Sequence, residues 1–134
     1  MIACVLMCAL AGAAIPFATV ARGTMSSIDE PQQVVVRTQA EWLKLWQRHG
    51  SGQPAPVIDF ETRMVVAVFL GSRPSAGYSV EIVEIRVAEG GLIVEYRETK
   101  PAPDRMVAQI VTAPFHLASL DRREGAVTFV PRTP

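Results

Sequence analysis

Several residue types that carry common functions are scarce in this chain of 134 residues. It contains no Asn, so it offers no acceptor for N-linked glycosylation, and glycine must supply the positive-φ positions of its turns. Both cysteines, Cys4 and Cys8, lie near the start, so we expect no structural disulfide and no thiol nucleophile in the rest of the chain. Thirteen basic residues balance thirteen acidic ones, and this zero net charge predicts no nucleic-acid partner.

Groups suited to catalysis are also few. The two histidines, His49 and His116, are far apart and lack the spacing of a zinc site, so we expect no metal and no cofactor. No glycine-rich phosphate loop precedes a helix. Ser79 follows Gly77 in the manner of a hydrolase elbow, but Glu81 stands where the second glycine is needed. The sequence therefore predicts that the protein is not an enzyme, and a small hydrolase using His116 is the weakest alternative.

The beginning of the chain differs from the rest, because residues 1–21 are mostly apolar and the first charged side chain is Arg22. Its apolar run, 2–14, has the length of a signal-peptide core and is too short for a typical membrane span. We predict an apolar leader or signal peptide over 1–21, cleaved after Ala21, then a polar tether over 22–33 and a single domain over 34–134. Export places that domain in the periplasm or outside the cell.

The start of this leader leaves alternatives open. A signal peptide normally opens with Lys or Arg, and none is present here. The sequence therefore leaves open whether the true start of the protein lies upstream of Met1. A retained anchor and lipidation of Cys4 are the two alternatives to cleavage. Contact with a membrane is expected only through an uncleaved leader.

The predicted domain begins with a short β-branched run at 34–36, followed by a helix. Thr38 and Glu41 form a capping box, and Gly50 supplies a stop, so we expect a helix over about 39–49. Its apolar stripe carries both tryptophans of the chain, Trp42 and Trp46, and should pack on a sheet.

The remainder of the domain has the pattern of β-strands. Seven consecutive apolar residues at 64–70 predict a central strand that is buried on both faces. The apolar alternation after Tyr78 slips by one between Ile82 and Val83, which predicts a β-bulge. Further strands are expected at 92–99, 107–111, 115–120 and 127–130. We predict an α+β fold, a mainly antiparallel twisted β-sheet of six or seven strands with one amphipathic helix packed on it. An all-β sandwich with the helix as an appendage is the alternative.

A set of short patterns is spread along the chain. They are Glu41-Trp42, Pro56-Val57-Ile58-Asp59-Phe60, Phe69-Leu70-Gly71, Gly77-Tyr78-Ser79-Val80-Glu81-Ile82, Tyr96-Arg97-Glu98, Pro101-Ala102-Pro103 and Thr112-Ala113-Pro114-Phe115-His116. Together they resemble the bacterial PrcB C-terminal domain family, named for an accessory subunit of a cell-surface protease complex, over about residues 37–130. The resemblance implies an exported, non-catalytic domain associated with a protease or an envelope complex. It brings no catalytic residues.

The loop at 71–78 is the expected contact with a protein partner. Its segment Arg73-Pro74-Ser75-Ala76-Gly77-Tyr78 is similar to the Asn-Pro-Thr-Thr-Gly-Tyr loop of chagasin-type cysteine-protease inhibitors, which implies a protease inhibitor as a second hypothesis. Arg73 replaces the Asn, and no Arg-Pro-Trp loop is present. A plain connection between strands, with Gly77 required by backbone geometry, is the third interpretation. The predicted partner-binding residues are Arg73, Pro74, Gly77, Tyr78, Pro101, Pro103 and His116.

Overall fold

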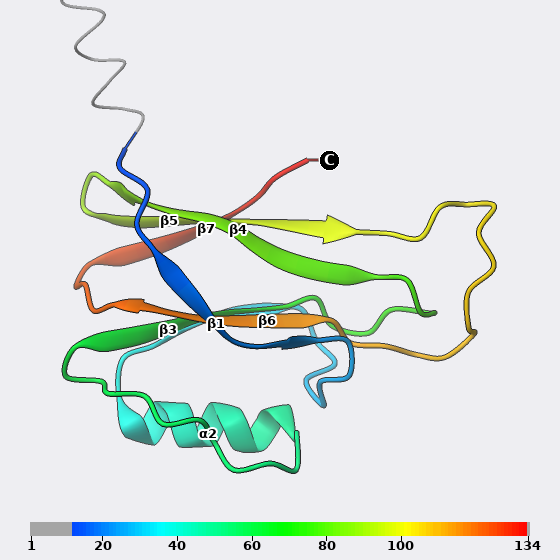
Figure 1. Cartoon of the computed structure of the whole chain (residues 1–134), viewed down its shortest axis with the longest axis horizontal. Helices are drawn as coiled ribbons and strands as arrows, with labels where there is room; N and C mark the ends of the chain where they lie inside the picture. Colours follow the sequence, from blue (N-terminus) through cyan, green and yellow to red (C-terminus); the bar gives the residue numbers. More distant parts are fainter. Residues whose placement is uncertain (1–11, 134) are drawn as a thin grey trace, which may run out of the picture.

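A computed structural model describes residues 12–133, which form two stacked β-sheets and one helix (Figure 1). The first sheet has the strand order β1-β6-β3-β2, and the second has the order β4-β5-β7. The strands are β1 (Phe17–Gly23), β2 (Gln32–Val36), β3 (Arg63–Phe69), β4 (Ser79–Ala88), β5 (Gly91–Thr99), β6 (Phe115–Asp121) and β7 (Ala126–Pro131). The helix α2 (Gln39–His49) lies on the side of the first sheet that faces away from the second (Figure 1).

Strand β3 lies at the centre of the molecule and is buried on both faces, as its unbroken apolar run predicts. Val65, Ala67 and Phe69 belong to the core layer beneath the helix. Met64, Val66 and Val68 belong to the core layer between the two sheets. Because side chains of a strand alternate between faces, one apolar strand supplies both layers.

The helix begins and ends where the sequence predicts. The Glu41 amide donates a hydrogen bond to Oγ1 of Thr38 (3.2 Å), and Gly50 adopts a left-handed conformation with φ of 70°. Trp42 is fully buried against the first sheet, and its indole Nε1 donates to the Pro56 carbonyl (2.9 Å). The predicted helix over 39–49 is confirmed.

The expectation of a single sheet is wrong, although the fold is α+β. The seven strands form two sheets, and β7 pairs with β5 in parallel rather than antiparallel. The physical reason lies in β3, because a sheet that is apolar on both faces needs a second layer on the side away from the helix. The sandwich alternative comes closer, but α2 covers a core layer and is not an appendage.

Two local expectations have opposite outcomes. The register of β4 against β5 shifts between Ile82 and Glu84, so the predicted β-bulge is confirmed. The strand expected at 107–111 is absent, and this segment is an irregular part of the long connection between β5 and β6. Ile110 and Val111 are exposed there, so their apolar side chains gain nothing from strand pairing over a core.

The end of the predicted leader takes part in both sheets. The Ile15 amide donates to the Ile85 carbonyl, and the Val87 amide donates to Ala13, each at 2.8 Å, at the free edge of β4. Strand β1 then pairs antiparallel with β6. The cleavage point expected after Ala21 therefore falls inside β1, and the expected tether at 22–33 includes the end of β1 and the start of β2. Residues 1–11 of the predicted leader, with both cysteines, lie outside the described residues.

No helix within residues 12–133 has the length and apolar character needed to cross a membrane.

Candidate functional site

Arg73 joins three segments at the end of the sandwich. Its backbone forms a two-way bridge with Thr112, with N···O distances of 2.7 and 2.9 Å. Its Nε donates to Glu98 of β5 at 2.8 Å, and its Nη1 donates to the Leu70 carbonyl at 3.0 Å. The hydrogen bond that Arg73 donates to the Glu98 carboxylate raises the pKa of the Arg73 guanidinium. This side chain was expected to face a partner, but the structure uses it to hold the loop 71–78 against β5.

The loop 71–78 and the segment 101–112 are joined by further hydrogen bonds. Thr112 Oγ1 donates to the Ser75 carbonyl (2.9 Å), and the Ala76 amide donates to the Ala108 carbonyl (3.0 Å). Gly77 has φ of 97°, and a Cβ added to it would lie 2.8 Å from Cβ of Pro101. Both loops supply predicted partner-binding residues, and the structure places them side by side. Of their predicted contact residues, Pro74, Gly77 and Pro103 are exposed, whereas Tyr78 and Pro101 are half-buried.

Large apolar side chains are exposed at this same end of the molecule. Met106, Val111, Met25 and Ile110 have exposed fractions between 97% and 53%, and they make up four of the seven large exposed apolar residues in the described chain. Met25 lies beside Ala113 in an isolated parallel bridge. We call this surface, formed by residues 24–26, 71–78 and 100–113, the loop end; its long segment projects beyond the sheets in yellow to orange (Figure 1).

Sequence reasoning missed these four apolar residues. The short apolar segment 107–111 resembles a strand, so Ile110 and Val111 were assigned to a sheet, and Met25 was assigned to a tether. A usable signal was present, because Pro101 and Pro103 precede the segment and disfavour regular strand pairing there.

His116 does not belong to the loop end. It lies in β6, is 3% exposed, and contacts β4 and β1. Its Nδ1 accepts the Ile82 amide at 2.8 Å, and its Nε2 lies 2.9 Å from Oγ1 of Thr19. Burial lowers the pKa of His116 to about 4, and the nearby charge of Arg22 acts in the same direction. His116 was expected among the partner-binding residues, but at 3% exposure its side chain is not presented to a partner.

The environment of His116 also argues against its use as a catalytic base. Because Nδ1 accepts a backbone N–H, the neutral ring carries its proton on Nε2. Nε2 therefore donates to Thr19 and has no lone pair with which to take the Thr19 proton. His116 therefore does not activate the Thr19 hydroxyl as a nucleophile.

His49, at the end of α2, is a second buried histidine. Its Nδ1 lies 2.8 Å from Oγ of Ser26, and its ring meets that of Phe115 edge to face with centroids 4.3 Å apart. Burial lowers its pKa. The side chain is packed in the core beneath the helix. Within residues 12–133 no three His, Cys, Asp or Glu side chains gather in a way that suits a metal ion.

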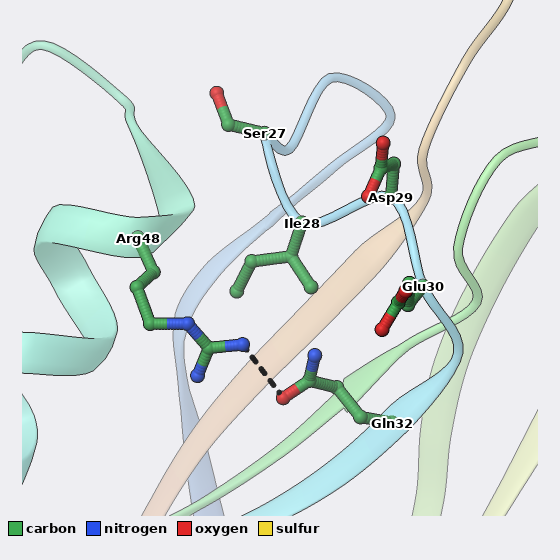
Figure 2. A pocket seen from close by; sticks show the side chains of 6 residues that line it. All are labelled: Ser27, Ile28, Asp29, Glu30, Gln32 and Arg48. Carbon is green, nitrogen blue, oxygen red and sulfur yellow. Dashed lines mark hydrogen bonds between the residues drawn. The ribbon is translucent and has the colours of Figure 1, made fainter.

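A small hollow lies between the C-terminal part of α2 and the segment that leads into β2. Its volume is about 260 Å³, and Arg48 crosses it to donate to Oε1 of Gln32 at 3.2 Å (Figure 2). Ile28 points into the space between these two side chains, and Asp29 and Glu30 of the same segment also line the hollow (Figure 2). The hollow has no His or Cys in its lining, and its one basic side chain, Arg48, is hydrogen-bonded to Gln32.

The fold and its loop end define the molecule as a small β-sandwich domain that displays apolar loops. The comparison with family models supports a more particular statement. Residues 64–121, from β3 through β6, match the family described as PrcB C-terminal. The resemblance noted in the sequence is thus confirmed for this segment, which holds the 71–78 loop, the 101–112 segment and the strands β4 and β6 that the Ile82–His116 hydrogen bond joins.

No curated protein and no solved structure matches the chain. The similarity to chagasin-type inhibitors thus gains no support from these comparisons and rests on the short loop alone.

Proposed function

We propose that this chain is a non-catalytic accessory domain of an extracytoplasmic protein complex, with a protease as the expected central component, and that it binds its protein partner through the loop end. The observation that carries the proposal is the concentration of exposed apolar side chains there. Single exposed apolar residues are ordinary on a protein surface, but a group of them on one projecting surface is typical of an interaction site.

The loop end is also suited to binding by its rigidity. Arg73 and Thr112 join its two main segments by backbone hydrogen bonds, and Thr112 Oγ1 adds a third bond between them. A loop that is already held in one conformation loses less entropy when a partner docks on it. Burial of a large apolar side chain such as Met106 contributes roughly 1.5–3 kcal/mol when it is complete.

This assignment changes the roles of the residues predicted from the sequence. Pro74, Gly77 and Pro103 stay within the proposed contact surface. Arg73 supports that surface from behind, and His116 has no part in it. The apolar residues of the 100–113 segment take their place as the main contacts.

The test is a comparison of partners recovered with variants of the loop end. The tagged full chain, expressed in its native bacterium, is isolated from the cross-linked envelope fraction together with its neighbours. The double variant Met106→Asp/Val111→Asp should recover about tenfold less of the partner found with the wild type, since apolar contacts near the centre of an interface carry most of its energy.

Val57→Asp is the matched control, because Val57 is 99% exposed but lies outside the loop end. It should recover the same partners as the wild type. Equal recovery of every partner by all three proteins, with unchanged thermal unfolding, contradicts the proposed surface.

The inhibitor hypothesis has a separate test. A papain-like protease and a trypsin-like protease are titrated with the purified chain, and an accessory domain leaves both activities unchanged at micromolar excess. Stoichiometric loss of either activity would favour the inhibitor instead.

A further inference from the structure

The sandwich is closed on one long side and open on the other. On the closed side, residues 13–15 pair with the edge of β4, and β1 pairs with β6. On the open side, β2 and β7 are the outermost strands of their sheets, and neither has a further strand partner among residues 12–133. The unpaired side of an edge strand presents backbone N–H and C=O groups to its surroundings.

A cleft of about 640 Å³ opens between the two sheets on this side. Leu70, directly after β3, lines the cleft from the first sheet, and Tyr96 of β5 lines it from the opposite sheet. Gln33 of β2 and Pro131 of β7 stand at its two rims. The volume is in the range of specific binding sites, and the lining combines apolar groups with a small number of polar ones.

The charged groups that line the cleft are mostly cationic. Three are basic, Arg73, Lys100 and Arg132, and one is acidic, Glu98. Glu98 is engaged by Arg73 at 2.8 Å, and Arg132 is engaged from outside the cleft by Glu95 at 3.0 Å. Lys100 is exposed and forms no ion pair with any described residue. An incoming carboxylate would therefore find an uncompensated cation at the mouth of the cleft.

We propose that this cleft binds an extended, acidic segment of a partner protein, placed between the edges of β2 and β7. An extended chain is the one kind of ligand that can pair with a strand edge while it sends alternate side chains into a pocket. The net positive lining selects for acidic residues in that segment. This binding site goes beyond the proposed function. It shares Arg73 and Lys100 with the loop end, but none of the four exposed apolar residues of the loop end lines it.

The test uses the full chain and two defined peptides. One is a fluorescent, end-blocked heptapeptide in which Glu alternates with Val, and the other carries Lys in place of Glu. Fluorescence anisotropy at low salt should show the acidic peptide binding about tenfold or more tightly than the basic one, and added salt should reduce the difference.

The chain offers a matched pair of variants, since Lys44 and Lys100 are its only lysines. Lys100→Glu should weaken binding of the acidic peptide about tenfold, whereas Lys44→Glu, on the exposed side of α2, should leave it unchanged. Carbodiimide cross-linking followed by mass spectrometry should join the acidic peptide to Lys100 in preference to Lys44. Lys100→Gln provides a milder variant if the charge reversal alters folding.

Several results would overturn the proposal. They are equal affinity for the two peptides, no measurable binding of the acidic peptide, equal loss in the two lysine variants, and cross-linking at Lys44. Sedimentation of the chain as a dimer that Lys100→Glu dissociates would show that a second copy occupies the cleft instead. None of these results bears on the apolar contacts of the loop end, because the cleft is not lined by Met106 or Val111 and the test changes neither.

Discussion

The imidazole of His116 in β6 accepts the backbone N–H of Ile82 in β4 at 2.8 Å, and so joins the two sheets at the β-bulge of β4. Strand β4 is the edge of its sheet, so this N–H faces away from β5 and needs another acceptor. Beside it, Arg22 Nε donates to the Val80 carbonyl at 2.9 Å. Two side chains of the first sheet thus satisfy the backbone edge of the second.

This role of His116 predicts how stability depends on pH. The unfolded imidazole has a pKa near 6.5, whereas that of the folded one is about 4, so the unfolded state binds more protons between these values. The contribution of His116 is therefore complete above pH 6.5 and is lost as the pH falls towards 4. The shift corresponds to a decrease on the order of 3 kcal/mol in the free energy of unfolding. His49 acts in the same direction.

The measurement is urea denaturation at several pH values between 7 and 4. His116→Gln should lower stability at pH 7 and flatten the pH dependence, because glutamine has no proton to take up in this range. A wild type whose stability stays constant from pH 7 to 4.5 would contradict the assigned state of His116.

The ion pair of Arg73 with Glu98 should contribute more to stability than the ion pair of Arg97 with Glu81. Both of its side chains are mostly buried, and Arg73 also donates to backbone carbonyls. Arg73→Ala should cost about 1–3 kcal/mol, because it leaves buried polar groups without partners. Arg97→Ala, which removes a longer and more exposed contact with Glu81, should cost about 1 kcal/mol or less. Chemical denaturation of the two variants decides this, and equal losses would contradict it.

Strand β1 is expected to stabilise the domain. Phe17 packs against the core layer between the sheets, and its neighbour Ala18 is exposed. Phe17→Ala should therefore lower the free energy of unfolding by about 2 kcal/mol, less than a fully buried phenylalanine would. Ala18→Ser should have little effect. Thermal unfolding of the chain that retains residues 12–23 provides the measurement, and an unchanged midpoint for Phe17→Ala would mean that β1 contributes nothing to folding.

Sequence patterns predicted the elements whose cause is local. The capping residues Thr38 and Gly50 determine the bounds of α2, and the phase slip at Ile82 determines the bulge. The division of the strands between two sheets was not predictable, because it depends on contacts between residues far apart in the chain. The apolar segment around Phe17 has the composition of a leader, and only its partner β6 makes it a strand. Burial of His116 was likewise invisible, since its acceptor role depends on an edge strand of the other sheet.

Gly77 offers a test of how closely the two loops must approach. Gly77→Ala meets two obstacles, a φ of 97° and a Cβ that would lie 2.8 Å from Pro101. Gly52, with φ of 77° and nothing within 4 Å of an added Cβ, meets only the first. Backbone strain alone costs about 1–2 kcal/mol for a non-glycine residue in the left-handed region. Gly52→Ala should thus cost that amount, and Gly77→Ala should cost more because Pro101 must also move.

Hydrogen exchange separates these two effects by location. In Gly77→Ala, the amides of Ala76 and Thr112 should lose protection, because the displaced segment weakens the bonds between the loops. The same amides should be unaffected in Gly52→Ala. Full protection of Ala76 and Thr112 in Gly77→Ala would mean that the close contact with Pro101 is dispensable. The loop end would then owe its shape to the hydrogen bonds between its segments, without the contact of Gly77 with Pro101.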